Sequence, residues 1–211
     1  MSCYSGRQAT ELLFGRDRLG KPFLADQGGP ANIMFNLAHS GSLVLVIVAA
    51  GRRVGVDLEQ VRPFKDFFQV AEASFTAEEC AFILSHAPGE RERAFFRSWA
   101  TKEAYIKGLG KGLSNLSKCS GAAILQGQSG CWLGDTDGRD SAPWWITDLE
   151  LPDGYEGAAV IEGGHHLMLH WNWNSLLRSE YTAWNYCSST LCPDRITAGP
   201  MTRATTDQES C

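Results

Sequence analysis

The sequence predicts a fold of mixed helices and strands, of the α/β (α+β) class, from three observations taken in chain order. Short apolar runs between turn signals in residues 33–59 indicate strands. Helical spacing follows in residues 76–107, where two helices are predicted. Residues 113–173 return to short strands separated by turns. Strands and helices segregated in this way are typical of that class.

The first strands are marked by apolar and β-branched residues. Residues 33–37 form a short apolar run, and residues 43–50 are rich in valine and leucine. Because the second run is continuously apolar, it predicts a buried strand. Gly51 and Arg52 indicate a turn, so residues 53–59 are expected to form the next strand and pair back on it as a hairpin.

The two helices are marked by their ends. Thr76 and Glu79 have the spacing of a capping box, which predicts a helix from there to about Ser85. A longer helix is predicted over residues 90–107. It should end at Gly108, because glycine is favoured just beyond the last helical turn.

The later segments are assigned by composition. Residues 127–143 are rich in glycine and aspartate and are predicted to be a surface loop. Residues 144–151, 157–161 and 165–173 are predicted strands. From residue 188 the chain is polar and poor in aromatic residues, so the tail is expected to be disordered.

Composition argues against several classes of function. The 211 residues carry a net charge of −5, whereas a nucleic-acid binder needs an excess of basic residues, so nucleic acid is not an expected partner. The apolar runs are too short to span a bilayer, and residues 1–11 lack a secretory signal, so no membrane association is expected. Seven scattered cysteines without Cys-x-x-Cys spacing indicate reduced thiols and a cytoplasmic location.

Two acids on the predicted strand 53–59 are candidate metal ligands. Because side chains alternate along a strand, Asp57 and Glu59 share a face, with Cα atoms about 7 Å apart. Gly55 on that face should leave room for a ligand beside Asp57. Two neighbouring carboxylates favour a cation, and oxygen ligands suit Mg²⁺. The alternative is an exposed strand edge with two ordinary acids. The opposite, buried face would hold Val54, Val56 and Leu58.

The long helix carries a second candidate group. Trp99, Glu103 and Lys107 lie at i, i+4 and i+8 and therefore form one stripe. The simplest interpretation is an exposed Glu–Lys ion pair, but Trp99 indicates that this face is partly buried. His39 and Ser40, at the end of a strand, offer an imidazole and a hydroxyl to a phosphate, although this pair alone is a weak signal.

Together these segments resemble the Sfp-type 4′-phosphopantetheinyl transferase family over about residues 19–173. The resemblance implies an α/β fold of two similar halves related by a pseudo-twofold axis. Here the first half, residues 1–54, would be incomplete, residues 55–175 would form the second half, and residues 176–211 the tail. The motifs that carry the resemblance are Gly20-Lys21-Pro22, Asn36-Leu37-Ala38-His39-Ser40, Gly55-Val56-Asp57-Leu58-Glu59 and Trp99-Ala100-Thr101-Lys102-Glu103-Ala104 followed by Lys107.

The resemblance implies a Mg²⁺ site and a catalytic pair. Asp57, Glu59 and Glu103 would hold Mg²⁺ against the pyrophosphate of coenzyme A. Glu103, or a water that it orients, would take the proton from the attacking serine, and Lys107 would neutralise charge on the pyrophosphate. The side chains expected to contact coenzyme A are those of Lys21, His39, Ser40, Lys102 and Lys107.

The expected activity is therefore Mg²⁺-dependent transfer of phosphopantetheine from coenzyme A to a serine of an acyl or peptidyl carrier protein, by a monomer. Two departures from the family pattern stand out. Ala38 replaces the usual serine before the histidine, and Gly20-Lys21-Pro22 comes very early in the chain. The alternative hypothesis is accordingly a truncated, non-catalytic relative that binds coenzyme A or a carrier protein.

Overall fold

The computed structural model of the chain divides into two compact units, residues 1–165 and 166–211. All of the predicted site residues belong to the first unit. Among the helices described, none is both long and apolar enough to cross a bilayer. The residues that the structure describes are 1–25, 32–111, 131–133, 143–163, 168–170 and 184–185.

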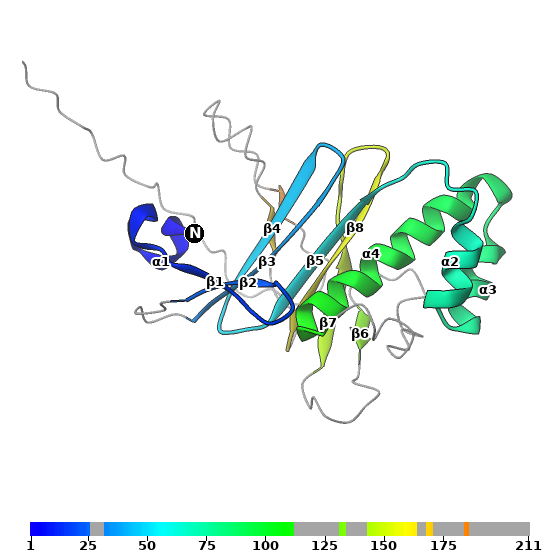
Figure 1. Cartoon of the computed structure of the whole chain (residues 1–211). Helices are drawn as coiled ribbons and strands as arrows, with labels where there is room; N and C mark the ends of the chain where they lie inside the picture. The colour runs from blue at the N-terminus through cyan, green and yellow to red at the C-terminus, as the bar shows by residue number, and fades with distance from the viewer. Residues whose placement is uncertain (26–31, 112–130, 134–142, 164–167, 171–183, 186–211) are drawn as a thin grey trace, which may run out of the picture. The chain divides into compact units, whose positions relative to one another are not determined.

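The chain runs through strands, then helices, then strands, as predicted for an α+β protein (Figure 1). In the second unit, β9 (Leu169–His170) pairs antiparallel with β10 (Trp184–Asn185). The elements of the first unit are α1 (Ser2–Ser5), η1 (Ala9–Glu11), β1 (Phe14–Arg16), β2 (Pro22–Leu24), β3 (Ile33–Ser40), β4 (Leu43–Ala50), β5 (Val54–Gln60), α2 (Phe67–Ser74), α3 (Ala77–Ser85), η2 (Pro88–Glu90), α4 (Arg91–Leu109), β6 (Cys131–Leu133), β7 (Trp144–Asp148) and β8 (Tyr155–Glu162).

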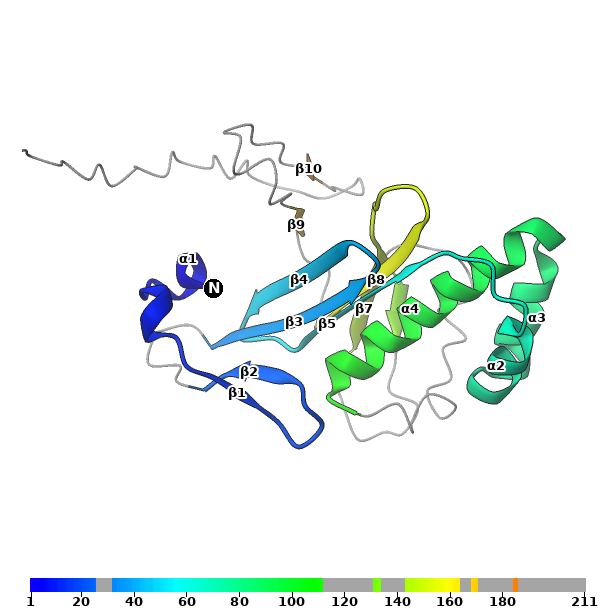
Figure 2. The ribbon, with the colours of Figure 1, turned by 45° about the horizontal axis from the view of Figure 1, so that its top comes forward.

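Strand pairing corrects one prediction. Residues 53–59 do not pair back on β4, because β5 pairs antiparallel with β8, from Val54 opposite Ile161 to Gln60 opposite Tyr155. The four-stranded sheet has the order β5-β8-β7-β6, and β3 pairs with β4 in a separate ribbon. It is β3 that lies beside β5 (Figure 2).

The exposure of β4 corrects a second prediction. Its bounds are those predicted, but it is not a buried strand, since Val44 and Val46 are 67% and 57% exposed. The composition of the run fits a strand, whereas its burial depends on what covers it.

The later strands follow the predictions with one exception. β7 lies within the predicted strand 144–151, and β8 extends beyond both ends of the predicted strand 157–161. Residues 131–133 form β6, so the segment 127–143 is not wholly a loop. The predicted tail beyond residue 188 lies outside the described residues.

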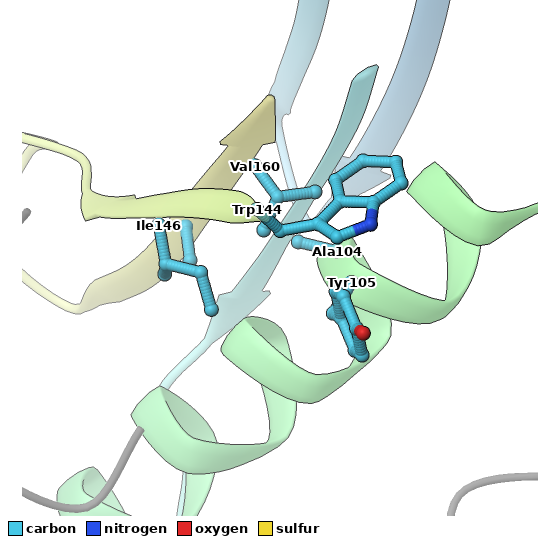
Figure 3. Close-up of a cluster of buried hydrophobic side chains, with 6 residues drawn as sticks. Ala104, Tyr105, Trp144, Ile146 and Val160 are labelled. Atoms are coloured by element: carbon cyan, nitrogen blue, oxygen red, sulfur yellow. The ribbon is translucent and has the colours of Figure 1, made fainter. Parts of the chain in front are cut away.

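The C-terminal half of α4 is fixed to the sheet by a buried cluster around Trp144 (Figure 3). The indole of Trp144 is fully buried and meets the ring of Tyr105 edge to face, with centroids 5.7 Å apart. Val160 of β8 and Ala104 of α4 complete the contact between helix and sheet (Figure 3). Because these contacts hold α4 across the sheet, they also fix the helix positions from which Glu103 and Lys107 project.

The N-terminal half of α4 packs against α2 and α3 through aromatic rings. Trp99, half-buried as its stripe indicated, lies 5.8 Å from the ring of Phe95 and 6.1 Å from that of Phe75, centroid to centroid. The predicted capping box of α3 is confirmed: the Glu79 amide donates to the Thr76 hydroxyl at 3.3 Å, and Glu79 Oε2 accepts from the Thr76 amide at 2.7 Å.

Gly55 lets helix α4 approach strand β5 closely. A Cβ atom at this position would lie 1.9 Å from the carbonyl oxygen of Ala104 and 2.5 Å from the amide nitrogen of Gly108. The expectation that Gly55 leaves open space for a ligand is therefore wrong, because the helix backbone fills that space. The glycine instead sets the distance between the strand and the helix that carry the candidate acids.

Gly55→Ala is expected to destabilise the protein by about 2 to 3 kcal/mol or more, because both clashing atoms belong to a helix backbone that cannot rotate away. The free energy of unfolding in urea measures the change. Gly89→Ala is the matched control, since a Cβ at Gly89 would meet no atom of the described residues within 4 Å. A Gly55→Ala variant as stable as wild type would show that α4 does not lie against β5 as described.

Candidate active site

The three predicted metal ligands come from β5 and α4, which pack face to face. As predicted, Val54, Val56 and Leu58 are buried on one face of β5. On the other face Asp57 turns toward α4, where its Oδ1 accepts a hydrogen bond from Lys107 Nζ at 2.6 Å. Glu103 lies one helical turn before Lys107 and is 8% exposed.

The acids of this group influence one another electrostatically. Burial raises the pKa of Asp57 to about 6, although the Lys107 ammonium opposes the shift and Glu59 adds to it. Burial, and next the charge of Asp57, raise the pKa of Glu103 to about 7, again against the effect of Lys107. Burial also raises the pKa of Glu59, with the Ser40 hydroxyl opposing. The three carboxyl groups therefore form one electrostatic cluster with Lys107 as its neighbouring cation.

Strand β3 contributes polar contacts to the same cluster. The Ser40 hydroxyl donates to Glu59 Oε2 at 3.3 Å and accepts from the Gln60 amide at 3.0 Å. Asn36, which is buried, accepts from the Val56 amide through Oδ1 at 3.0 Å. These bonds join β3 to β5 where the backbone ladder does not, and the sequence motif gave no indication of this structural role for Asn36.

His39 lies on the opposite side of β3 from Ser40, because neighbouring strand residues alternate. The imidazole is exposed. Of the two predicted phosphate contacts at the end of β3, the structure therefore brings Ser40 to the carboxylate cluster and leaves His39 on the other face of the strand.

Lys21 reaches this region from the turn between β1 and β2. Its Nζ donates to the main-chain carbonyl of Lys107 at 2.5 Å and to that of Val54 at 3.4 Å. The ammonium is thus bonded to the backbones of the two elements that carry the acids, a contact that the sequence did not indicate.

Lys102, predicted to contact coenzyme A, is not brought to this group. Its side chain is 1% exposed and its Nζ donates to Glu79 Oε2 of α3 at 2.7 Å. It also donates to the Ser74 carbonyl at 3.0 Å and lies 5.0 Å from the centroid of the Phe75 ring. In this structure Lys102 joins three helices to one another and has no ammonium surface to offer a ligand.

The donor set fits a hard divalent cation. Asp57 Oδ2 is buried and has no hydrogen-bond partner among the described residues, so a lone pair is available inside the cluster. Carboxylate oxygens are the ligands that Mg²⁺ prefers. Within the described part of the chain, no three His, Cys, Asp or Glu side chains are yet grouped closely enough to hold a metal by themselves. Asp57, Glu59 and Glu103 would therefore have to move closer together to share an ion, and oxygens from a bound ligand would complete its shell.

Glu103→Gln is expected to stabilise the protein at about pH 8 by on the order of 1 to 2 kcal/mol, and to have no such effect near pH 4. The pKa of Glu103 in the folded state is about 7, above its ordinary value of 4.5. Between pH 4.5 and about pH 7 the Glu103 carboxyl loses its proton in the unfolded chain but keeps it in the folded protein. The stability of the wild-type protein therefore falls as the pH rises through this range. Urea unfolding at both pH values, without divalent cations, measures the difference; equal stabilities at about pH 8 would contradict the pKa shift.

The fold and this cluster define a class: an α+β protein whose candidate site is a group of carboxylates and lysines between a strand and a helix. Comparison with known proteins identifies the family. Residues 53–159 match the family model of the 4′-phosphopantetheinyl transferase superfamily, and the chain belongs to this superfamily. The matched segment begins just before β5, spans α4 and ends within β8, so it includes Asp57, Glu59, Glu103 and Lys107.

Three curated relatives agree with this assignment. The chain is 35% identical over 115 residues to 4′-phosphopantetheinyl transferase HetI of Nostoc sp., covering 54% of this chain and 48% of that one. It is 32% identical over 168 residues to a phosphopantetheinyl transferase of Thraustochytrium sp., covering 74% and 57%. It is 34% identical over 150 residues to 4′-phosphopantetheinyl transferase psf-1 of Bacillus pumilus, covering 70% and 60%. The chain thus spans about half the length of the relatives it matches.

Proposed function

We propose that this protein transfers the 4′-phosphopantetheine group of coenzyme A to a serine of an acyl or peptidyl carrier protein. The observation that supports the proposal best is the electrostatic cluster of Asp57, Glu59 and Glu103 beside Lys107. After burial, the charges of neighbouring acids raise the pKa values of Asp57 and Glu103, so a cation among these acids would be favoured. Membership of the superfamily supplies the reaction class.

We assign Asp57, Glu59 and Glu103 as the ligands of Mg²⁺. When bound, the cation would supply charge neutralisation for the pyrophosphate of coenzyme A. The buried Oδ2 of Asp57, which has no hydrogen-bond partner in the described part of the chain, supports this assignment. The remaining ligands would be oxygens of the substrate and of water, since Mg²⁺ in such sites commonly keeps several of them.

The protein's part in the reaction is to position groups and to accept a proton. The serine oxygen attacks the phosphorus atom that carries the pantetheine arm, and the bond from that phosphorus to the oxygen of the departing adenosine 3′,5′-bisphosphate breaks. The serine proton passes to Glu103, directly or through a water that Glu103 orients. The Lys107 ammonium, next to Asp57, stabilises negative charge on the pyrophosphate.

Two further contacts to coenzyme A, those of Ser40 and His39, are proposed without naming the substrate atoms. Ser40 is bonded to Glu59 and therefore lies at the cluster, and the exposed His39 is free to meet the nucleotide from the other face of β3. We further propose a monomer acting in the cytoplasm, without nucleic acid or membrane as partner. The acidic net charge of −5 supports the exclusion of nucleic acid.

The test is the intact mass of an apo carrier protein incubated with this protein, coenzyme A and Mg²⁺, with an EDTA control. The proposal predicts that the carrier gains one phosphopantetheine and that EDTA abolishes the gain. An unchanged mass, obtained with folded protein and with carriers of both the acyl and peptidyl kind, would overturn it. In that case binding of coenzyme A without transfer would support the non-catalytic alternative.

A further inference from the structure

The turn that presents Lys21 is internally bonded. Asp17 Oδ1 accepts from the amides of Leu19 and Lys21 at 2.8 and 2.9 Å, and the Asp17 amide donates to the Lys21 carbonyl at 2.9 Å. Gly20 occupies this turn with φ of 85°, a conformation that favours glycine. These bonds fix the backbone of Lys21, so its side chain leaves the turn in a defined direction.

The ammonium of Lys21 ends on two carbonyl groups that are distant in the sequence. Lys107 belongs to the last turn of α4, where a positive charge is favourable, and its carbonyl also accepts from the Gly110 amide at 3.2 Å. Val54 begins β5, three residues before Asp57. One side chain therefore joins the β1–β2 turn, the end of α4 and the start of β5.

This junction shares one residue, Lys107, with the contact to the Asp57 side chain. The residue whose carbonyl Lys21 holds is the same residue whose Nζ donates to Asp57 Oδ1 at 2.6 Å. The Lys21 side chain is half-buried, and burial together with Arg53 and Lys107 lowers its pKa, while Asp17 opposes the shift. A cation kept in such surroundings is held there by its carbonyl partners.

We propose that Lys21 is a positioning residue. Its two hydrogen bonds, called the tie below, connect the main chain of Lys107 to that of Val54 and so place the Lys107 ammonium next to Asp57. The proposal rests on the proposed function, and it assigns Lys21 a role other than direct contact with coenzyme A. Loss of the tie would let the last turn of α4 move away from β5, and displacements of about 1 Å at a reacting group can reduce rates by about 100-fold.

The test compares Lys21→Met and Lys21→Arg with wild type, with Lys65→Met as the control for loss of one exposed positive charge. In Lys21→Met we expect kcat for transfer to fall about 10- to 100-fold, while KM for coenzyme A changes by less than about three-fold. Lys21→Arg should recover most of kcat, because a guanidinium can donate to both carbonyls. Lys65→Met should match wild type.

A second readout does not depend on activity. Without coenzyme A, amide hydrogen exchange at residues 108–110 should be at least about 10-fold faster in Lys21→Met than in wild type, while exchange in the first turns of α4 stays unchanged. If wild-type protein transfers nothing, the proposed function fails, but this comparison still decides whether the tie exists. Unchanged exchange overturns the proposal.

A rise in KM for coenzyme A with kcat intact would also overturn it, since Lys21 would then contact the substrate. If Lys21→Met does not fold, amide exchange, KM for coenzyme A and kcat measured on Lys21→Arg test the proposal. Exchange and KM close to wild type, with kcat largely retained, would support the tie. A KM raised about 10-fold at unchanged kcat would contradict it.

Discussion

Asp57→Asn is expected to reduce phosphopantetheine transfer by at least about 10²- to 10³-fold. Asparagine keeps the shape of the side chain and its Oδ1 acceptor, but it removes the negative charge from the buried atom Oδ2, which has no partner among the described residues. Lys107 loses the carboxylate to which its Nζ now donates at 2.6 Å. Transfer rates measured at saturating coenzyme A and Mg²⁺, by the intact mass of the carrier, give the size of the loss.

The matched control is Asp153→Asn, which removes one negative charge at an exposed loop position. It should transfer at the wild-type rate. Circular dichroism should show the same helical content in both variants, because the side-chain amide oxygen in Asp57→Asn can still accept from Lys107. Transfer by Asp57→Asn at the wild-type rate would remove Asp57 from the reaction.

Lys102→Met is expected to lower the free energy of unfolding by about 3 to 5 kcal/mol, because it leaves the buried carboxylate of Glu79 without its cation. The side chains of Lys102 and Glu79 are 1% and 2% exposed, and their charged atoms are 2.7 Å apart. Glu79→Gln should cost a similar amount for the converse reason. Urea unfolding near neutral pH measures both, with the exposed Lys65→Met as control.

The double variant Lys102→Met, Glu79→Gln should recover part of the loss, since neither partner is then left as an unpaired charge. The KM for coenzyme A of folded Lys102→Met should equal that of wild type. A variant of wild-type stability with a raised KM would instead show that Lys102 contacts coenzyme A, as its position in the motif suggested.

The two lysines of the α4 motif show what a sequence motif leaves undetermined. Lys102 and Lys107 are five residues apart, which places them about 140° from each other around a helix, so they cannot serve the same site from the same face. The stripe of Trp99, Glu103 and Lys107 was predictable from helical spacing, and the structure places Lys107 against Asp57. The burial of Lys102 depends on α3, whose packing no local pattern specifies.

The strands likewise have some properties that depend on neighbouring residues and others that depend on residues far away in the sequence. The alternation that separates Asp57 and Glu59 from the buried Val56 is a property of one strand, and it was predictable. The pairing of β5 with β8 joins residues about a hundred positions apart, and a plausible hairpin with β4 competes with it in the sequence. For the same reason the exposure of Val44 could not be read from a run of apolar residues.

The glycine and the lysine at the junction illustrate a further limit. A glycine in a strand indicates a close approach, but the sequence does not say of what; Gly55 was expected to admit a ligand and instead admits the backbone of α4. Lys21 was expected to contact coenzyme A, and its ammonium is bonded to two main-chain carbonyls. The division at residue 54 and the pseudo-twofold relation between halves stay predictions.

Calorimetric titration of Mg²⁺ into coenzyme A-saturated protein shows whether Asp57, Glu59 and Glu103 act as one cation site. A pH of about 8 lies above the pKa values of Asp57, about 6, and of Glu103, about 7. We expect one Mg²⁺ to bind per wild-type chain, with affinity weakened at least about 10-fold in both Asp57→Asn and Glu103→Gln and unchanged in Asp153→Asn. Equal affinity in wild type and in the two site variants would contradict a shared cation site.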